Sequence, residues 1–361
     1  MKRMITGMAA ALLAAVLFFP VSAVSADSYI LMDGLTGRIL EQRNADDRSL
    51  IASTTKIMTA LVVCEQANVL DRVRIPREAV GIEGSSVYLK EGEILTVQEL
   101  LYAMMLHSGN DAATALAIYC GGTVEGFAQL MNDKAHLLDL ANTHFVNPHG
   151  LDALDHYSTA ADLAKLTAYA MKNPIFVRTV SAKNATINNR QLRNHNKLLW
   201  QVDGADGVKT GYTKSAGRIL VSTAVRHGRR LICVTINDPN DWHDHKRLIE
   251  NGFLNYSIQT IVEEGNVITQ VDVAGGTAQN VELVADASFH YPLSAHEKVA
   301  VVFPQAGFVY APVVKGASAG YANLLIGDEI IGRVPLVYGA TIEQQRNIEQ
   351  PFWKKLLKGC E

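Results

Sequence analysis

The spacing of hydrophobic and polar residues divides this 361-residue chain into regions with different periodicities. Residues 27–256 mix apolar positions at helical spacing with short strand-like runs, which is typical of a domain containing both helices and strands. Residues 257–340 are rich in valine, with short strand-like runs between Gly or Pro turns and no helical period. We therefore predict an α/β (α+β) domain, then a small all-β domain, then a tail at residues 341–361.

Within the first domain, the same patterns predict individual elements. Thr96-Val97-Gln98-Glu99 has the capping-box pattern that begins a helix. The expected strands are Tyr29–Met32, Arg38–Glu41, Val208–Tyr212, Ile219–Val225 and Leu231–Asn237, the first two joined by a turn at Asp33–Gly37. The expected helices are Ser53–Asn68, Leu100–Leu106, Val124–Leu140, Thr159–Lys172 and Lys246–Tyr256, with another that begins at Asp111.

The first residues have the pattern of an export signal. A positively charged start precedes the apolar run Met8–Phe19, whose length of about a dozen residues is short for a membrane span. Small residues then offer cleavage after Ala23 or Ala26, and the site Val24-Ser25-Ala26 is the better of the two. We predict a signal peptide at residues 1–26 and an exported protein.

The end of the chain has two chemical faces if it is helical. One side would hold apolar side chains and the other lysines: Phe352, Trp353, Leu356 and Leu357 against Lys354, Lys355 and Lys358. Such a helix can anchor a protein at a membrane surface, here the outer face of the cytoplasmic membrane. Eleven residues form only a marginal helix, so a frayed tail is an equal alternative.

Composition excludes several classes of function. The net charge is −3 and no basic patch is present, so we expect no nucleic-acid partner. The four cysteines are widely spaced without a metal-ligand pattern, so we expect neither a metal site nor another cofactor. Cys64, Cys120 and Cys233 each lie in an apolar run, where a small buried side chain is expected, although a disulfide among them stays open outside the cell.

Candidate chemistry begins with Ser53 and Lys56, at the expected start of a helix. Residues three apart lie on one helical face, so the Lys56 amine can reach the Ser53 hydroxyl. A lysine whose pKa is lowered by an apolar or cationic setting can remove the proton of such a serine. By itself Ser-x-x-Lys is weak, since it should occur by chance roughly once in a chain of this length.

Two further motifs change this estimate. Ser108-Gly109-Asn110 lies at a helix break and Lys209-Thr210-Gly211 lies on a strand, and each of the three motifs occurs once. Their order is that of class A β-lactamases and penicillin-binding proteins, although the middle motif there is usually Ser-Asp-Asn. Chance coincidence of all three in this order behind a signal peptide is roughly a percent or less. We therefore interpret them as one catalytic site.

The residue types suit acyl transfer. Ser53 would attack and Lys56 would take its proton, while Ser108 relays a proton to the leaving amine. Asn110 would hold Lys56 and the substrate amide. For the substrate, the expected contacts are a carboxylate on Lys209 and Thr210, a backbone edge at Gly211, and an oxyanion hole from the backbone N–H groups of Ser53 and Tyr212.

The chain resembles low-molecular-weight penicillin-binding proteins of the D-alanyl-D-alanine carboxypeptidase family, of the penicillin-binding protein 5 type. The resemblance covers nearly the whole chain, including the signal peptide, the β domain and the amphipathic tail. Its motifs are Asp33–Gly37, Ser53–Ala60, Gly84-Ser85-Ser86-Val87 with Leu89 and Gly92, Ser108–Ala112, Asn147–Asp152, Ser158-Thr159-Ala160, Lys209-Thr210-Gly211 and Ala216-Gly217.

The resemblance implies a penicillin-recognising catalytic domain of the serine transpeptidase/β-lactamase-like fold. The implied activity is removal of the terminal D-Ala from peptidoglycan stem pentapeptides through a Ser53 acyl-enzyme, in cell-wall biosynthesis and control of cross-links. The implied partners are the D-Ala-D-Ala stem peptide as substrate and β-lactam antibiotics as inhibitors, because the lactam mimics D-Ala-D-Ala.

The chain departs from the family pattern in three places. Ile51 stands where a Pro is common, and Tyr212 stands where some members have His. Better-known members have an Arg shortly before the closing helix that assists with the terminal carboxylate, whereas this chain has Asp241-Trp242-His243-Asp244-His245. We therefore expect carboxylate binding to rest on Lys209 and Thr210 alone.

The remaining histidines have simpler interpretations. His149 lies in a turn without an acidic partner nearby in sequence, so we expect a structural role. His243 and His245 around Asp244 lack a third ligand cluster, so we expect a helix cap with solvated side chains rather than a metal site. Trp242 is expected to contribute packing.

Other functions use overlapping motifs. A class A β-lactamase would need a deacylating Glu between Asn110 and Lys209, where only Glu125 occurs, inside an expected helix. An endopeptidase or transpeptidase acting on cross-links uses the same three motifs, and the sequence separates these weakly. A catalytically silent peptidoglycan-binding protein would be expected to have degraded motifs, whereas all three are intact here.

Overall fold

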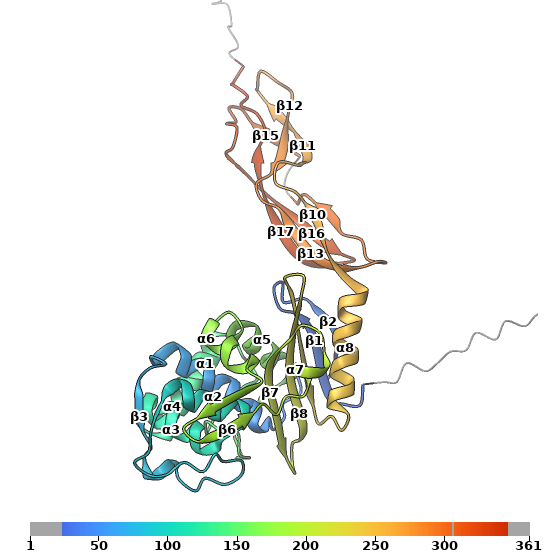
Figure 1. The fold of residues 1–361 in the computed structure, drawn as a ribbon. Helices are drawn as coiled ribbons and strands as arrows, with labels where there is room; N and C mark the ends of the chain where they lie inside the picture. Colours follow the sequence, from blue (N-terminus) through green and yellow to red (C-terminus); the bar gives the residue numbers. More distant parts are fainter. Residues whose placement is uncertain (1–23, 305–306, 346–361) are drawn as a thin grey trace, which may run out of the picture.

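A computed structural model describes residues 24–304 and 307–345. Figure 1 shows a larger domain of helices and strands and a slender β domain, joined at the end of the last helix. No helix within these described ranges is long and apolar enough to cross a membrane.

A five-stranded antiparallel sheet forms the centre of the larger domain. Its strand order is β2-β1-β9-β8-β7, so the first strands of the chain lie beside the last ones of the domain. The strands are β1 (Ser28–Asp33), β2 (Ile39–Arg43), β7 (Ala205–Thr213), β8 (Gly217–Arg226) and β9 (Arg229–Ile236). Strand β7 is the last of the order, and its free edge faces the helices.

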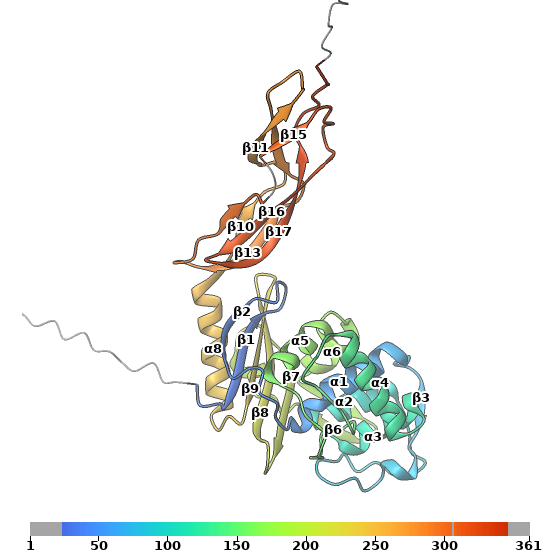
Figure 2. The same ribbon diagram turned by 180° about the vertical axis from the view of Figure 1, so that it is seen from behind.

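Helices cover both faces of this sheet (Figure 2). One face packs against α8 and α7, and the other packs against α5 and α6, behind which α1–α4 lie. The helices are α1 (Lys56–Gln66), α2 (Val97–Leu106), α3 (Asn110–Gly121), α4 (Val124–Leu137), α5 (Ala160–Ala170), α6 (Pro174–Ser181), α7 (Leu198–Gln201) and α8 (Asp241–Asn255).

Successive side chains along the central strands point alternately to the two faces of the sheet and pack into two separate cores. In β1, Ile30 and Met32 point into the core beneath α1 and α5, whereas Tyr29 and Leu31 point into the core beneath α8. Successive side chains on a strand face opposite sides of the sheet, so a strand buried on both faces has no polar side. Burial of both faces explains why the short apolar run of β1 is continuous rather than alternating.

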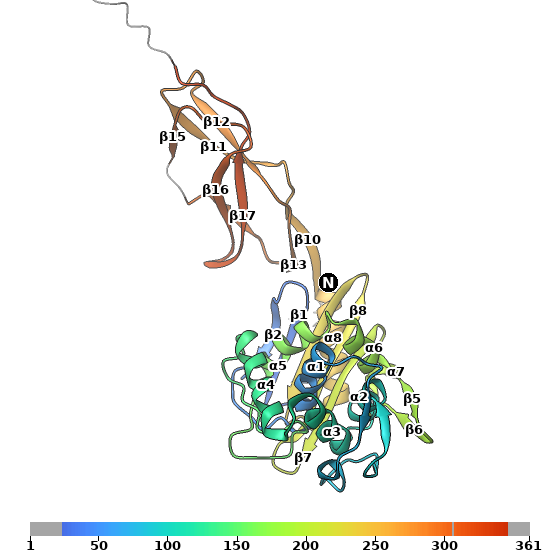
Figure 3. The same cartoon turned by 90° about the vertical axis from the view of Figure 1, so that its left-hand side faces the viewer.

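The β domain extends away from the larger domain (Figure 3). A six-stranded sheet in the order β14-β16-β17-β12-β11-β15 accompanies the pair β10-β13. The strands are β10 (Tyr256–Val262), β11 (Val267–Ala274), β12 (Asn280–Ala285), β13 (Phe289–Ser294), β14 (Ala300–Val302), β15 (Phe308–Tyr310), β16 (Ser318–Ile326) and β17 (Glu329–Tyr338).

Arg38 connects the two domains at their junction. Its guanidinium donates to the Pro292 carbonyl and pairs with Glu297, and it lies 5.3 Å and 5.1 Å from the ring centres of Tyr256 and Tyr291. One guanidinium thus satisfies polar groups from the β domain while resting on aromatic faces, which favours a defined junction.

The expected fold class is confirmed, and the main elements lie where the patterns placed them. The closing helix begins at Asp241 rather than Lys246. The helix α6 was missed although Asn173 and Pro174 form a helix start, with the Asn173 side chain capping the N–H groups of Ile175 and Phe176. Short pairs were also missed: β3 (Arg72–Arg74) with β4 (Ile94–Thr96), and β5 (Asn184–Ile187) with β6 (Arg190–Arg193).

The expectation of solvated side chains at the start of α8 is wrong for His245. This imidazole is fully buried between α8 and the sheet, with Nδ1 2.6 Å from Ser222 Oγ and Nε2 3.0 Å from Thr235 Oγ1. Burial lowers the pKa of His245 to about 3, so the ring is neutral. His243 is exposed as expected. Because α8 starts one turn earlier than predicted, His245 points inward.

The cysteine expectation is confirmed where side chains are described. Cys64 and Cys233 are buried, Cys120 is partly buried, and these three are free thiols. Burial raises the pKa of Cys64 to about 12 and that of Cys120 to about 11, which keeps both protonated and unreactive. Cys360 and the expected amphipathic tail lie outside the described residues.

Gly252 allows α8 to approach the sheet closely. A Cβ at this position would lie 2.8 Å from side-chain atoms of both Leu31 and Leu231. We predict that Gly252→Ala lowers the free energy of unfolding by about 1–3 kcal/mol through overpacking. Leu254→Ala on the same helix is the control, since Leu254 is exposed and should change the free energy by less than about 0.5 kcal/mol. Urea denaturation of both variants measures this, and equal stabilities would contradict it.

Candidate active site

Ser53 lies in a 3₁₀ turn, Ala52–Thr55, that leads directly into α1. Ala52 has a φ of 45°, in the left-handed region that non-glycine residues rarely occupy. The turn is held by the Thr54 hydroxyl, which donates to the Ile51 carbonyl at 2.5 Å. Gly150 packs against the turn so closely that a Cβ there would lie 1.8 Å from the Ala52 carbonyl oxygen. The unusual backbone thus presents Ser53 at a fixed orientation.

Lys56 is fully buried and its amine contacts three oxygen atoms. The Nζ lies 2.9 Å from Ser53 Oγ, 2.7 Å from Asn110 Oδ1 and 2.7 Å from the His149 carbonyl oxygen. Burial, and then the charge of Lys209, hold the pKa of Lys56 well below its usual range. A neutral amine can donate to two of these oxygens while its lone pair faces the Ser53 hydroxyl. Lys56 is therefore placed to take the Ser53 proton.

The Ser108-Gly109-Asn110 segment forms the second wall. Ser108 has a φ of 64°, and it lines a cleft of about 290 Å³ together with Ser53, Thr210, Gly211 and Tyr212. Asn110 begins α3, and besides accepting from Lys56 it donates from its side chain to the Glu83 carbonyl at 2.6 Å and from its backbone to the Ser85 carbonyl at 2.7 Å. These bonds tie the start of α3 to the loop that contains Glu83 and Ser85, which precedes α2 in the chain.

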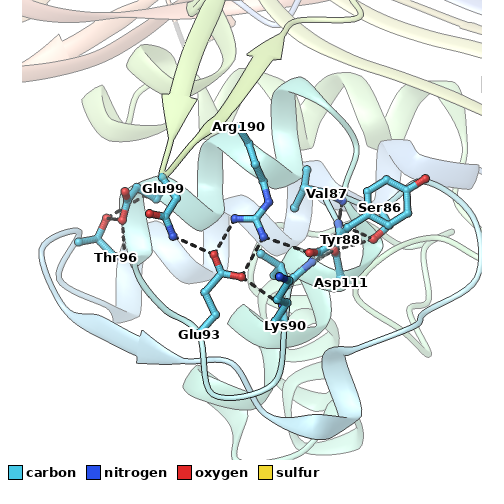
Figure 4. A network of polar contacts seen from close by, with 11 residues as sticks. Ser86, Val87, Tyr88, Lys90, Glu93, Thr96, Glu99, Asp111 and Arg190 are labelled. Carbon is cyan, nitrogen blue, oxygen red and sulfur yellow. Dashed lines mark hydrogen bonds and ion pairs between the residues drawn. The ribbon is translucent and has the colours of Figure 1, made fainter.

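Asp111, the next residue, holds that loop in place (Figure 4), and Ser85 of the loop lines the cleft. Its carboxylate accepts from the Ser86 hydroxyl at 2.6 Å and from the backbone N–H groups of Val87 and Leu89. Carboxylates that accept backbone N–H groups order a loop strongly because these bonds are charge-assisted. These contacts explain why the segment Gly84–Leu89, which is among the motifs of the family resemblance, is ordered beside the start of α3.

An ion pair holds the far end of the same loop (Figure 4). Arg190, from β6, makes two hydrogen bonds to Glu93 at 2.6 and 2.9 Å and one to the Tyr88 carbonyl at 3.0 Å. The guanidinium lowers the pKa of Glu93 to about 2. The β5–β6 hairpin, which the sequence analysis missed, therefore supports the site, because its Arg190 holds the Tyr88–Glu93 end of the loop that borders the cleft.

Lys209-Thr210-Gly211 occupies the free edge of β7. Lys209 is buried and donates to the Thr210 carbonyl at 2.8 Å, and burial lowers its pKa to about 7. A Cβ on Gly211 would lie 3.3 Å from the Ser53 backbone nitrogen, so glycine allows the strand to approach the nucleophile. Tyr212 is 65% exposed at the cleft. The structure thus brings all eight predicted site residues to one place.

Arg218 is a cleft residue that the sequence analysis missed. It pairs with Tyr212 across β7 and β8 and makes three hydrogen bonds to the buried Asp241 carboxylate, at 2.8, 2.9 and 3.1 Å. Both residues line the cleft with Trp242, whose ring centre lies 5.8 Å from the Arg218 guanidinium. The register of the expected Val208–Tyr212 and Ile219–Val225 hairpin could have placed a residue near Arg218 opposite Tyr212.

Histidines near the cleft are uncharged. Burial and the Lys56 charge lower the pKa of His149 to about 3, and burial and the Lys209 charge lower that of His195 to about 4. The structural role expected for His149 is consistent with its contacts, since its ring accepts from the Leu151 N–H and its backbone carbonyl accepts from Lys56. The identity of the His149 side chain gave no indication that its backbone carbonyl would accept a hydrogen bond from Lys56.

The geometry defines a class of protein. A helix-flanked antiparallel sheet, with a Ser-Lys pair at one helix start and a Lys-Thr-Gly edge strand beside it, is the architecture of the penicillin-recognising serine enzymes. A family model described as D-alanyl-D-alanine carboxypeptidase matches residues 17–240, and one described as the C-terminal domain of penicillin-binding protein 5 matches residues 256–344. The chain belongs to the D-alanyl-D-alanine carboxypeptidase family and is a serine peptidase.

Individual relatives agree with this assignment. D-alanyl-D-alanine carboxypeptidase DacF of Bacillus subtilis is 30% identical over 87% of this chain and 85% of its own length. DacA of Haemophilus influenzae is 34% identical over 82% of this chain and 80% of its own length. The crystal structure of penicillin-binding protein 5 from Haemophilus influenzae superposes with a TM-score of 0.75 at 30% identity, covering 89% of this chain and 98% of that one.

The two lysines predict a bell-shaped dependence of activity on pH. Lys56 must be neutral to take a proton, so kcat/KM should rise with pH through the lowered pKa of Lys56. Lys209 must be charged to attract a carboxylate, so kcat/KM should fall as pH rises through about 7. A bound carboxylate favours the charged form, so the alkaline limb of kcat should lie at higher pH than that of kcat/KM.

Steady-state kinetics on a D-Ala-D-Ala peptide between pH 5 and pH 10 would measure both limbs. Lys209→Gln is the informative variant, because it should lower kcat/KM and remove the alkaline limb near pH 7. An alkaline limb unchanged by this substitution would show that another group titrates there.

Proposed function

We propose that this enzyme removes the terminal D-Ala from peptidoglycan stem pentapeptides through an acyl-enzyme on Ser53. The observation that supports this most directly is the 2.9 Å contact between Ser53 Oγ and the buried amine of Lys56. A serine becomes a nucleophile only when a base accepts its proton, and a lysine is such a base at neutral pH only when its pKa is lowered. The relatives named as D-alanyl-D-alanine carboxypeptidases support the choice of substrate.

Acylation would follow from the contacts around Ser53. The neutral Lys56 amine takes the hydroxyl proton as Oγ attacks the D-Ala carbonyl, and the backbone N–H groups of Ser53 and Tyr212 donate to the oxyanion. The proton then passes through Ser108 to the leaving amine, and free D-Ala departs. Asn110 keeps Lys56 in place through its Oδ1. The expected roles for these residues therefore stand as our proposal.

Deacylation distinguishes this enzyme from a class A β-lactamase. The candidate Glu125 lies in the first turn of α4 with an exposed side chain, and it does not line the cleft. Water attack on the acyl-enzyme would therefore depend on Lys56 and Ser108 rather than on a carboxylate. A penicillin-derived ester, which keeps its leaving amine tethered, should consequently be long-lived.

For the terminal carboxylate, we propose Arg218 in addition to Lys209 and Thr210. Among the described residues lining the cleft, Arg218 is the one permanent cation, since His195 has a pKa of about 4. Lys209 has a pKa of about 7 and already donates to the Thr210 carbonyl. Asp241 fixes the guanidinium without covering it, because the Arg218 side chain remains 43% exposed. This replaces the expectation that Lys209 and Thr210 act alone.

We further propose an extracytoplasmic location, with the amphipathic tail at the outer face of the cytoplasmic membrane. Support comes from the charged and apolar pattern of residues 1–26 and 351–361. Deletion from Pro351 should move the protein from the membrane fraction to the soluble fraction. An unchanged membrane fraction would remove the tail as the anchor.

Penicillin labelling tests the nucleophile. We predict that intact mass spectrometry after incubation with penicillin shows a gain of one penicillin on the wild type and none on Ser53→Ala. Ser86→Ala is a matched control, because this hydroxyl donates to Asp111 rather than to the catalytic amine and should leave labelling intact. Labelling that survives Ser53→Ala would mean that the nucleophile lies elsewhere. A D-Ala release assay on the same samples then tests the carboxypeptidase activity.

Substrate termini test Arg218. We predict that Arg218→Gln lowers kcat/KM for a peptide ending in D-Ala-D-Ala by about 10–100-fold, the cost of one charge-assisted hydrogen bond. The same peptide with a C-terminal amide should lose far less, so the preference for the free acid shrinks. Arg218→Lys should keep part of that preference. Arg226→Gln is the control, since Arg226 lies at the other end of β8 and pairs with Glu250. An unchanged acid-to-amide ratio in Arg218→Gln would contradict the assignment.

A further inference from the structure

The export signal ends in the same triplet twice, Val21-Ser22-Ala23 and Val24-Ser25-Ala26. Each triplet ends in the small residue that a leader peptidase requires before the bond it cuts. The apolar run Met8–Phe19 ends four positions before Ala23 and seven positions before Ala26. The sequence pattern therefore admits both bonds, and the folded domain has to distinguish them.

The second triplet is built into the catalytic domain. Val24 is 5% exposed and Ala26 is 1% exposed, and both side chains belong to the core beneath α8. The segment continues the path of β1 along β9, because the Asp27 N–H donates to the Ile236 carbonyl at 3.1 Å. A chain that began at Asp27 would lack both apolar side chains and would leave a cavity beneath α8, which is destabilising.

Arg43, at the end of β2, binds the backbone of this triplet. Its guanidinium donates to the Val24 carbonyl at 3.0 Å and also to the Ala26 carbonyl. The same guanidinium lies 5.4 Å from the ring centre of Tyr29, in β1. These contacts fasten the triplet to the edge strand of the sheet, and a chain without the triplet would lose both acceptors of Arg43.

Ser25 links two buried carboxylates. Its hydroxyl lies 2.6 Å from Asp238 Oδ1 and 2.7 Å from Asp244 Oδ2, and its backbone N–H donates to Asp244 Oδ2 at 2.7 Å. Asp238 is fully buried and Asp244 is 2% exposed. Burial raises the pKa of the Asp238 carboxyl, and the hydrogen bond from Ser25 opposes that rise. Removal of Ser25 would take donors from both carboxylates in a buried position, which is costly.

The carboxylate pair also favours a positive charge at Val24. Arg247 lies 3.5 Å from Asp244, whereas the Ser25 hydroxyl has one proton to share between the two carboxylates. A cut before Val24 creates an α-ammonium group one residue before the Ser25 N–H, and opposite charges attract strongly near buried groups. The ammonium group of an Asp27 start would instead take the place of the N–H that donates to the Ile236 carbonyl.

The same two carboxylates lie on either side of Asp241, which holds Arg218 at the cleft. Asp238 precedes α8 and Asp244 lies in its first turn, so Ser25 fastens the start of the helix on both sides of Asp241. Loss of the triplet would therefore loosen the segment that positions the Arg218 guanidinium, in addition to opening the core.

We infer that the leader is cut after Ala23, so that the exported enzyme begins at Val24 and its first three residues are part of the catalytic domain. A leader peptidase would hydrolyse the amide bond between Ala23 and Val24, so that water supplies the new carboxylate of Ala23 and the amine of Val24 becomes the N-terminus. The boundary lies three residues before the one that the sequence pattern favours, because the pattern does not record which residues the fold buries.

N-terminal sequencing of the enzyme from the exported fraction tests this inference directly. A first residue of Val24 is the expected result. A first residue of Asp27, or a chain that still begins at Met1, would overturn the inference.

Two chains with defined first residues test the physical reason. One begins at Val24 and the other at Asp27, each released from a fusion partner by a protease and each continuing to Glu361. The Asp27 chain should have a Tm lower by about 5–10 °C, because it lacks two buried side chains and the donors of two buried carboxylates. Equal Tm values would overturn the inference.

A single substitution keeps the test available if the Asp27 chain does not fold. Ser25→Ala should still yield Val24 as the first residue, and it should lower the Tm by about 2–4 °C. Ser215→Ala is the matched control, because Ser215 is exposed between β7 and β8 and should change the Tm by less than about 1 °C. An unchanged Tm in Ser25→Ala would remove the carboxylate contacts as the reason to retain the triplet, and the inference with them.

Discussion

The structure of the site depends on one buried amine. Lys56 has no exposed surface, and its nitrogen lies within 2.9 Å of oxygens from three separate segments: the nucleophile turn, the start of α3 and the loop that ends at Gly150. Burial makes the charged form of lysine costly, which lowers its pKa and converts a surface-type residue into a base. The surrounding segments pack around this amine and exclude solvent from it. The same packing places Ser53 Oγ, Asn110 Oδ1 and the His149 carbonyl oxygen within hydrogen-bond distance of it.

The second constraint is the free edge of β7. A sheet edge offers unpaired backbone groups, which most proteins cover, but here the edge faces the nucleophile turn and ends the sheet order. Gly211 permits an approach that a side chain would block, and the loop anchored by Asp111 and Arg190 closes the opposite side. In the proposed reaction, a peptide substrate pairs with this strand while its carbonyl meets Ser53. Order in the loop comes both from charge-assisted bonds and from the burial of Val87 and Leu89 in the core.

Charge states distinguish the subsites. Lys56 and Lys209 have lowered pKa values, and His149 and His195 are neutral, so the catalytic centre holds little permanent positive charge. Arginine cannot be neutralised in this way. Permanent charge is therefore found at Arg218, on the rim of the cleft, and the cavity of about 760 Å³ beside the cleft is lined by Arg193 as well. This arrangement separates proton transfer, which needs a neutral amine, from recognition of carboxylates, which needs a cation.

The sequence alone indicated the three candidate motifs, the fold class and most of the central strands and helices, because each depends on residue type and local spacing. Periodicity also located β1, whose continuous apolar run matches a strand buried on both faces. Tertiary structure alone decided what depends on distant segments meeting: the His149 carbonyl on Lys56, Arg218 in the cleft, and His245 in the core rather than in solvent. Arg218 and Asp241 are 23 residues apart, and no local pattern indicates their pairing. The cavity of about 760 Å³ beside the cleft likewise joins β6, the segment before α7, and β8, so only the packed molecule shows that Arg193, Lys197 and Arg218 face one cavity.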